Sequence, residues 1–425
     1  MTGPRSDQDV QRALSAWMDE VAPTRPPVRL LEETFATTMR ARQDGARPWN
    51  RIDAGRPGRS FRPGPVVAVL FAAILIIVAF AVAISGGAPS AVPRPAPSAS
   101  QPVTNPATPS PLVTPSPGAA LPAAESVTPD AMIDIDRPIA LAVGGSSIWI
   151  LAPGRIDEVD PTLNKFTGSA EIGSESDAYQ GIAANDAGVW ATHSSTPPLT
   201  RVDPTTRKVT ARITAGVAPK GVLATADAVW VADLRGGAVL RVDFGIDAVA
   251  ATVPVGLAGN SGPNWLASGL GSIWVDMPNN NTVARIDETT DTVQATITIP
   301  PPMTPCGGIA VGPDAVWVTG CDATTTMARI DPATNVFVGT TELGGHGYNL
   351  VVINGAPWVS VDPRGADAGY LARIDPATNT VDRVLVPGGG AFGGGGDIVV
   401  ADGAVWVSDG YNNRLLRLPM SAFAP

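Results

Sequence analysis

The sequence contains few cysteine, histidine and charged residues. Of its 425 residues, two are Cys, two are His and 16% are charged, whereas about 25% of an average soluble domain is charged. This scarcity of metal-binding side chains argues against a Cys/His zinc module. The net charge of −10 argues against nucleic-acid binding, because such a surface needs basic residues to displace counterions from phosphates.

Common catalytic and phosphate-binding motifs are missing as well. No Ser/His/Asp, Walker or GxGxxG motif stands in a setting that would support its chemistry. The Gly-rich run 388–396 leads into a strand pattern rather than a helix, so it lacks the helix N-terminus that favours phosphate binding. We expect this run to be a flexible insertion.

One long apolar run is present instead. Residues 66–84 contain no charged or polar side chain, and a helix of this length crosses the hydrocarbon layer of a membrane. Five Arg residues precede the run closely, whereas the 40 residues after it contain a single one, Arg94. Since Lys and Arg favour the cytoplasmic side, we predict one transmembrane helix over 65–86, with the N-terminus in the cytoplasm of a bacterial cell and the C-terminal part outside.

Residues 1–64 form the predicted cytoplasmic region. Their apolar residues recur at helical spacing in two short stretches, followed by an Arg- and Gly-rich segment. One interpretation is a hairpin or membrane-surface helix, and the other is a docking site for a cytoplasmic partner. Residues 16–43, AWMDEVAPTRPPVRLLEETFATTMRARQ, resemble the N-terminal region of bacterial membrane proteins with an anti-sigma-factor architecture. That resemblance implies a sigma factor as the partner, although residues 1–64 lack the zinc-binding His and Cys that many anti-sigma factors carry.

Residues 87–129 read as an extended linker. The stretch 88–129 contains 12 Pro together with many Ser, Thr and Ala, and its charged residues are Arg94 and Glu125. Such a composition cannot bury a core and favours a partly polyproline-II spacer. We expect this linker to hold the C-terminal region away from the membrane.

The C-terminal region, 130–425, consists of seven repeats. Each repeat carries a tag such as AVWV, and most carry a second tag such as RVDPTT (201–206) or RIDPAT (329–334). Four short apolar runs per repeat, separated by Gly, Pro, Asp and Asn turns, predict four-stranded antiparallel units. A period of about 40–45 residues with four strands is typical of β-propellers, so the fold class is all-β, with seven blades. The tag Trp residues are 149, 190, 230, 274, 317, 358 and 406.

The ends of the repeat region predict how the ring closes. The last repeat stops one strand short at Pro425, and AMIDID (131–136) precedes the first repeat as a spare strand. We predict that this N-terminal strand completes the seventh blade, which leaves no long open edge.

The two tags resemble those of the bacterial YVTN, NHL and virginiamycin B lyase-like propellers over about 295 residues. The resemblance implies the propeller fold, with the Trp residues packed between blades and the Asp-Pro pairs setting turns. Lyase-like members use His and Glu around a divalent metal at the channel mouth, which implies an alternative function here, a metal-dependent lyase or hydrolase. His193 and His346 would then have to meet across the channel, and the sequence has no His-x-Glu-x-His-like cluster.

The two cysteines belong to the fifth repeat. Cys306 and Cys321 lie on strands joined by the turn 312–315, at positions that face each other if the register is regular. We therefore predict a disulfide, as is common outside the cytoplasm; two buried thiols are the alternative.

The candidate ligand site is the channel mouth, where the innermost strands start. Ten residues before the tag Trp, the repeats carry Ile139, Gln180, Lys220, Asn264, Gly307, Tyr348 and Gly396. Past the Trp, the same face collects His193, Asp233, Asp276, Asp322, Asp362 and Asp409. A solvated polar mouth without a ligand is the alternative. Our candidate ligand-binding residues are Gln180, Lys220, Asn264, His346, Tyr348, His193, Asp233, Asp276 and Asp409.

Together these patterns predict a single-pass membrane protein that presents an extracytoplasmic propeller for binding or sensing. A non-catalytic role is favoured over an enzyme. The expected partners are the membrane, an extracellular ligand or protein and a cytoplasmic partner of residues 1–64. No cofactor is identified, and a divalent metal is expected under the lyase alternative alone.

Overall fold

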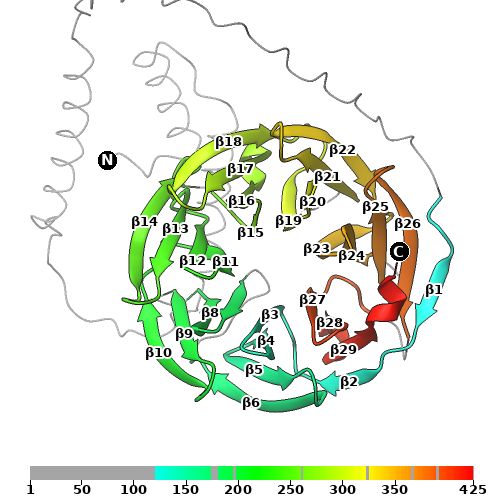
Figure 1. Cartoon of the computed structure of the whole chain (residues 1–425), viewed down its shortest axis with the longest axis horizontal. Coiled ribbons are helices and arrows are strands. Elements are labelled where there is room, and N and C mark those ends of the chain that lie inside the picture. The colour runs from blue at the N-terminus through cyan, green and yellow to red at the C-terminus, as the bar shows by residue number, and fades with distance from the viewer. Residues whose placement is uncertain are drawn as a thin grey trace, which may run out of the picture. The chain divides into compact units, whose positions relative to one another are not determined.

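The structure, a computed structural model, describes residues 120–173, 180–194, 198–259, 262–321, 325–364, 368–388 and 392–424. These residues form a seven-bladed β-propeller, with seven antiparallel units around a central axis (Figure 1). The predicted fold class is confirmed. The predicted cytoplasmic region, the transmembrane helix and most of the linker lie outside the described residues. Within the described part of the chain, no helix is long and apolar enough to cross a membrane.

Each blade starts with its innermost strand and proceeds outwards along the chain. From the inside outwards, the strands of blades 1 to 3 are β3 (Ala140–Gly144), β4 (Ser147–Ala152), β5 (Arg155–Asp160), β6 (Lys165–Glu171), β7 (Ile182–Asn185), β8 (Gly188–Thr192), β9 (Leu199–Asp203), β10 (Lys208–Ile213), β11 (Pro219–Ala224), β12 (Val229–Asp233), β13 (Ala238–Asp243) and β14 (Ala248–Pro254). Those of blades 4 to 6 are β15 (Leu266–Gly269), β16 (Ser272–Met277), β17 (Thr282–Asp287), β18 (Thr292–Thr298), β19 (Pro305–Val311), β20 (Val316–Gly320), β21 (Thr326–Asp331), β22 (Val336–Glu342), β23 (His346–Ile353), β24 (Ala356–Asp362), β25 (Tyr370–Asp375) and β26 (Thr380–Pro387).

Blade 7 closes the ring with strands from both ends of the chain. Its order is β27 (Ile398–Ala401), β28 (Ala404–Asp409), β29 (Arg414–Pro419) and then β2 (Ala131–Asp134). β2 pairs antiparallel with β29, with Ile133 opposite Leu415. Beside this pairing, Arg417 donates to Asp130 at 2.7 Å. The predicted closure is confirmed.

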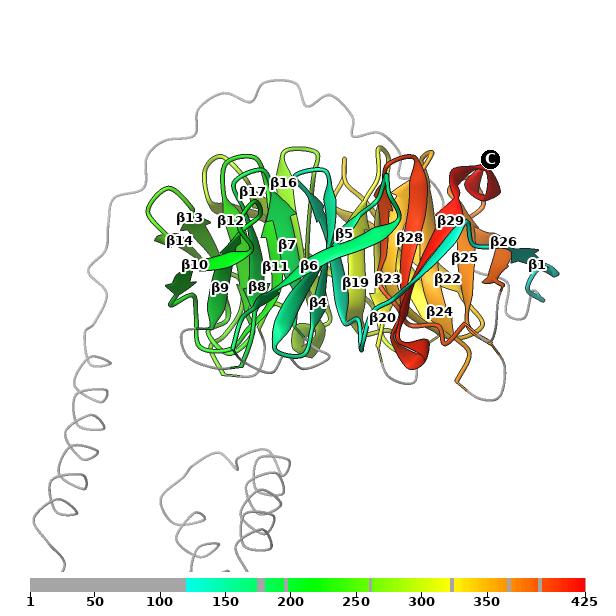
Figure 2. The same ribbon diagram turned by 90° about the horizontal axis from the view of Figure 1, so that it is seen from below.

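A further strand precedes the closing one. β1 (Ala124–Val127) pairs parallel with β26 and makes blade 6 five-stranded. Figure 2 shows β1 at the rim of the propeller, beyond β26. Glu125 forms a salt bridge with Arg383 of β26 at 2.9 Å. The propeller therefore recruits residues that the sequence assigned to the linker 87–129.

The tag Trp residues pack between blades, as the resemblance implied. All seven are at most 1% exposed, because each second strand is covered on both faces by neighbouring blades. Trp149 of blade 1, for example, shares a core cluster with Ile182 and Val189 of blade 2. Trp406 of blade 7 packs with Ile148 of blade 1, which carries the core across the ring closure.

The Arg of the second tag ties several blades to the next one along the chain. Arg201 lies opposite Trp190 in blade 2, with its guanidinium 5.5 Å from the indole centroid. It donates to the Phe244 carbonyl and to Asp247, both in the outer turn of blade 3. Arg285 of blade 4 reaches the corresponding turn of blade 5 through the Pro332 carbonyl at 2.7 Å.

The Asp of the second tag shapes the turn that follows, as predicted. Asp203 accepts hydrogen bonds from the N–H groups of Thr205 and Thr206, an Asx arrangement that fixes tight turns. The same pattern recurs at Asp287, with Thr289 and Thr290 as donors.

Three short 3-10 helices complete the described elements: η2 (Pro278–Asn280), η3 (Gly410–Asn412) and η4 (Met420–Phe423). Phe423 of η4 is buried and lies edge-on to Trp358, with 4.7 Å between ring centroids.

The predicted disulfide is confirmed. Cys306 of β19 is bonded to Cys321, which directly follows β20, and their Cα atoms lie 5.3 Å apart. The regular register that we assumed for this pair is wrong, because the pairing shifts between Pro305 and Gly308. This bulge places Pro305 opposite Gly320, so Cys306 lies within the bulge and Cys321 follows the last pair of the ladder.

Candidate functional site

A pocket of about 490 Å³ lies at the channel mouth, where the innermost strands begin. Residues from six of the seven blades line it. Five of the seven positions that lie ten residues before a tag Trp are among them: Ile139, Gln180, Gly307, Tyr348 and Gly396. The repeat register therefore located the mouth correctly. Lys220 and Asn264, at the two remaining positions, are not part of the described lining.

Aromatic side chains form much of the pocket wall. Trp265, Tyr348 and Tyr411 all line it, and His346 lies edge-on to Tyr348 with 4.5 Å between ring centroids. Sequence reasoning missed two of them. Trp265 is the one Trp after residue 129 outside the seven tags, which was a readable signal. Tyr411 follows β28 in η3, and no pattern in the sequence pointed to it.

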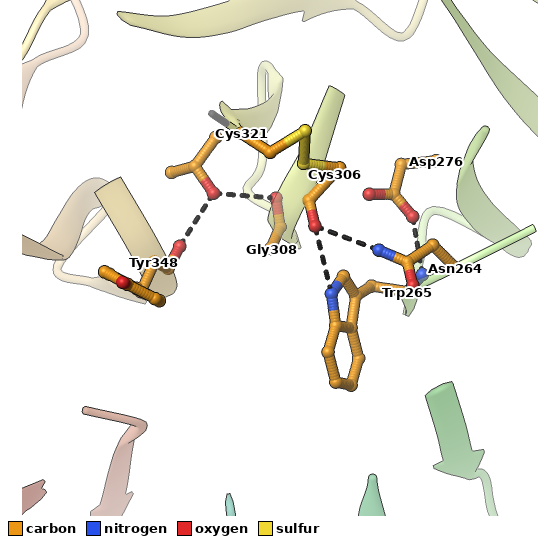
Figure 3. Close-up of a disulfide and its surroundings, with 8 residues drawn as sticks. Asn264, Trp265, Asp276, Cys306, Gly308, Cys321 and Tyr348 are labelled. Carbon is orange, nitrogen blue, oxygen red and sulfur yellow. Dashed lines mark hydrogen bonds between the residues drawn. A yellow bond between two sulfur atoms is a disulfide. The ribbon is translucent and has the colours of Figure 1, made fainter. Parts of the chain in front are cut away.

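Hydrogen bonds behind the wall fix the position of Trp265. Its backbone N–H donates to Asp276 Oδ1 at 2.5 Å, and its indole Nε1–H donates to the Cys306 carbonyl at 3.1 Å. Asn264 Nδ2 donates to the same carbonyl at 2.9 Å. Figure 3 shows Asn264 and Trp265 converging on Cys306 next to the disulfide. The indole ring of Trp265 in this wall comes from blade 4. It is held by the backbone of Cys306, a disulfide residue of blade 5.

Asp276 lies behind this wall and does not line the pocket. It is fully buried, and burial raises the pKa of its carboxyl group to about 8, against the opposing effect of the hydrogen bond from Trp265. Asp276 thus has a supporting position, as the acceptor that orients the backbone at Trp265.

A hydrogen bond from blade 5 supports Tyr348 in turn. The hydroxyl of Thr319 donates to the Tyr348 carbonyl at 2.7 Å, across the boundary between blades 5 and 6. Contacts between blades therefore brace the mouth at Trp265 and Tyr348, both near the start of an innermost strand.

The described part of the Gly-rich run, residues 392–396, passes close to two tyrosines of the mouth. Phe392 is 1% exposed in the core between blades 6 and 7. A Cβ on Gly393 would lie 2.4 Å from Cδ2 of Tyr411, and a Cβ on Gly395 would lie 2.8 Å from Cε2 of Tyr348. Gly395 also has φ of +70°, which side chains rarely adopt. Residues 389–391 of the run lie outside the described residues.

Two arginines at the pocket were not among our candidates. Arg137 and Arg364 both line it, and none of the described lining residues is an Asp or a Glu. Arg364 has φ of +53°, and its N–H donates to Asp362 Oδ1 at 2.8 Å. Asp362 therefore shapes the loop that presents Arg364.

The two histidines differ in position. His346 lines the pocket, whereas His193 is fully buried, does not line it and shares a 2.6 Å hydrogen bond with the hydroxyl of Thr200. Within the described residues, no group of three His, Cys, Asp or Glu side chains is arranged to hold a metal ion.

The carboxylates of the remaining acidic candidates bind nearby backbone N–H groups or an arginine. Asp233 is 4% exposed and accepts from the N–H groups of Val217 and Ala218. Asp409 is fully buried and pairs with Arg414 at 2.9 Å. Neither carboxylate is part of the described pocket lining. Asp322 lies outside the described residues.

Of the polar candidates at strand starts, Gln180 is 3% exposed, and its side-chain amide, turned to satisfy both groups, donates to the Thr192 carbonyl and accepts from the Ser194 N–H. The carbonyl of Lys220 accepts from the Thr192 hydroxyl at 2.6 Å. The structure thus brings Gln180, His346 and Tyr348 together at one pocket, and it places the other six candidates away from the described lining.

Comparisons with known proteins are consistent with this fold. No family model matches the chain, and no curated protein matches it. A solved chain of hydrazine synthase from Kuenenia stuttgartiensis is 14% identical with a TM-score of 0.56, covering 68% of this chain and 97% of that one. A chain of a mitotic checkpoint complex is 12% identical with a TM-score of 0.55, covering 79% and 99%. The Pan2 WD40 domain of Neurospora crassa is 12% identical with a TM-score of 0.51, covering 67% and 89%. At such identities the likeness shows the β-propeller fold alone.

Proposed function

We propose that this chain is a single-pass membrane protein whose extracytoplasmic propeller binds or senses a ligand or protein at its mouth. The apolar run 66–84 and the Arg residues before it support the membrane topology. The Cys306–Cys321 disulfide fits an oxidising compartment. The repeat tags support kinship with the YVTN, NHL and virginiamycin B lyase-like propellers.

The observation that carries the binding function is the pocket itself. Its 490 Å³ lies in the range of small-molecule sites, which combine aromatic walls with a few polar groups. Trp265 and Tyr348 stand on braced strand ends. A site held in advance loses little conformational entropy when its ligand binds. These features favour recognition, which needs no nucleophile or metal.

A metal-dependent lyase or hydrolase is the weaker alternative. It requires His193 and His346 to act on one metal, but His193 is buried against Thr200. Metal-dependent turnover that is lost in His346→Ala would favour the enzyme.

If the protein signals, residues 1–64 would respond to ligand binding by the propeller. The resemblance of residues 16–43 to anti-sigma-factor-like proteins suggests a sigma factor as their partner. The Pro-rich composition of residues 87–129 predicts a flexible linker, which would not transmit a rigid rotation, so we propose that signalling works through clustering. Co-purification of one defined cytoplasmic protein with residues 1–64 of the full-length chain tests this part.

The binding function is tested by melting the full-length chain in detergent micelles with a panel of divalent metals, sugars and peptides. A ligand at 100 times its Kd adds about 2.7 kcal/mol, which raises Tm by several degrees. We expect at least one shift that Tyr348→Ala abolishes. Phe166→Ala, which removes an exposed ring on the outer strand β6, should leave the shift unchanged. A panel without shifts, or shifts that persist in Tyr348→Ala, would count against the mouth site.

A further inference from the structure

The charged side chains of the described pocket lining are opposite in sign to the net charge of the propeller sequence. Residues 130–425 contain 17 basic and 30 acidic residues. The charged residues of the described pocket lining are nevertheless both arginines, Arg137 and Arg364. A local excess of positive charge in an acidic protein attracts anionic ligands and repels cationic ones.

Arg364 is held in a position to bind a ligand. Its backbone is fixed by the hydrogen bond to Asp362, and its side chain is exposed. Among the described residues, no carboxylate lies within salt-bridge distance of its guanidinium. By contrast, Arg155, Arg201, Arg383 and other arginines of the blades are paired with carboxylates.

Arg137 is similar. It directly precedes Pro138, which lines the pocket, and its N–H donates to Asn413 Oδ1 at 3.0 Å. Its guanidinium lies 3.9 Å from the carboxylate of Asp136, and both side chains are more than 60% exposed. Such an exposed contact is weak, so an incoming anion can compete for Arg137.

Rings are the second feature of the site. Tyr411 is 74% exposed, and Trp265 and Tyr348 complete the aromatic part of the lining. Flat apolar faces of this kind stack on sugar rings and on aromatic rings. The aromatic side chains select a ligand with a flat ring, and the arginines select a ligand with a negative charge. A ligand that fits both features belongs to a narrower class.

We propose that the mouth pocket binds a ligand in which a ring carries a carboxylate, such as a sugar acid or an aromatic acid. The carboxylate pairs with Arg137 and Arg364, since guanidinium groups bind carboxylates through charge-assisted hydrogen bonds. The ring stacks against the tyrosines and Trp265. This inference rests on the proposed binding function and specifies the chemistry of the same site.

The test uses two matched pairs of probes on the full-length chain in detergent micelles. Glucuronate is compared with glucose, and benzoate with benzyl alcohol, by calorimetric titration and tryptophan fluorescence. We expect at least one acid to bind at least tenfold more tightly than its neutral partner. Its affinity should fall as salt is raised from about 50 to 500 mM, because salt screens exposed charges.

A matched control separates the site from general charge effects. Arg235 follows Asp233 by two residues, as Arg364 follows Asp362, and it is exposed without lining the pocket. Arg364→Gln and Arg137→Gln should each weaken binding of the acid about tenfold, whereas Arg235→Gln should not change it. An unchanged Tm in all three variants shows that folding is preserved.

The outcomes are distinguishable. If neutral and acidic partners bind alike, or if Arg364→Gln and Arg137→Gln bind the acid as the wild type does, the anion inference is wrong and the binding function stands. If none of the four probes binds, the inference is wrong for this ligand class. If no member of the wider panel binds either, the proposed function fails with it.

Discussion

Glu158 of blade 1 and Arg207 of blade 2 form a salt bridge at 2.5 Å whose charges are reversed relative to the next interface. There, Arg201 of blade 2 pairs with Asp247 of blade 3 at 2.9 Å. In both pairs, the first residue lies opposite the tag Trp of its blade and the second lies in the outer turn of the next blade. Equivalent positions at the two interfaces therefore carry ion pairs of opposite orientation.

Reversing one partner of this pair should destabilise the propeller. Arg207→Asp places a carboxylate beside Glu158, which is 8% exposed, and should lower the free energy of unfolding by about 2 kcal/mol. Adding Glu158→Arg recreates the Arg201–Asp247 arrangement and should recover most of that loss. Urea unfolding followed by tryptophan fluorescence measures the coupling as a double-mutant cycle. A double variant no more stable than Arg207→Asp would show that the pair has no specific role.

Closure through β2 predicts a contrast between two neighbouring residues. Ile133 is 8% exposed and packs in the core with Trp406, whereas Met132 is 56% exposed. Ile133→Ala should cost about 2–4 kcal/mol and Met132→Ala less than about 1 kcal/mol, measured by the same unfolding experiment. Deletion of residues 130–137 should lower Tm sharply. Equal effects of the two alanine variants, or an unchanged Tm after the deletion, would refute the closure.

Burial of Asp276 predicts a pH dependence. The pKa of this carboxyl is raised to about 8 in the folded protein, above its ordinary value, so the folded state holds the proton more tightly than the unfolded state. Its contribution therefore increases stability as pH falls from about 8 towards 4. Asp276→Asn keeps an acceptor for the Trp265 N–H and should flatten the dependence of Tm on pH between 6 and 9. An identical pH profile in the variant would contradict this assignment.

The aspartates of the turns, Asp203 and Asp287, make stability decrease as pH falls, whereas Asp276 makes it increase. Hydrogen bonds from Thr206 lower the pKa of Asp203, and those from Thr290 lower the pKa of Asp287. These groups stabilise the fold above the pKa of the unfolded carboxyl, and the contribution is lost as pH falls through their lowered folded values. Tm should therefore decline below about pH 4. The joint variant Asp203→Asn, Asp287→Asn should show a weaker decline, and a decline as steep as that of the wild type would contradict the turn assignment.

The disulfide should stabilise blade 5 and the pocket wall together. Closing a loop of 15 residues is worth about 3 kcal/mol by chain entropy. Cys306→Ser with Cys321→Ser should lose about that amount and should also weaken ligand binding, because the Cys306 carbonyl anchors Trp265. Trp265→Phe keeps the ring without the indole donor and serves as a control for the wall alone. Full stability without the disulfide would contradict its structural role.

Much of the fold could be predicted from the sequence because the repeats encode contacts that recur. Each tag Trp fills the same gap between blades, and each tag Asp, such as Asp203, caps the same turn. Closure followed from counting strands at the two ends. β1 was missed because a four-residue strand next to Pro-rich sequence carries no alternating pattern. The bulge beside Cys306 was missed because register was extrapolated from the turn.

The site was harder to predict, since a strand position fixes where a residue lies and leaves open where its side chain points. The repeat register places Asp233 and Asp409 near the mouth. Their carboxylates, however, bind nearby backbone N–H groups and Arg414. The residues that line the pocket instead come from irregular loops. Arg364 has a left-handed backbone conformation, and Tyr411 belongs to a 3-10 helix. The repeat pattern specifies neither of these local conformations.

The most direct test of the account is amide hydrogen exchange of the full-length chain with and without the tightest-binding probe. We predict protection at residues 264–266, 346–349 and 392–396, around the mouth, and none at the outer turns such as 203–206. Protection confined to the outer turns or rim, or no protection with any probe, would contradict a ligand site at the mouth.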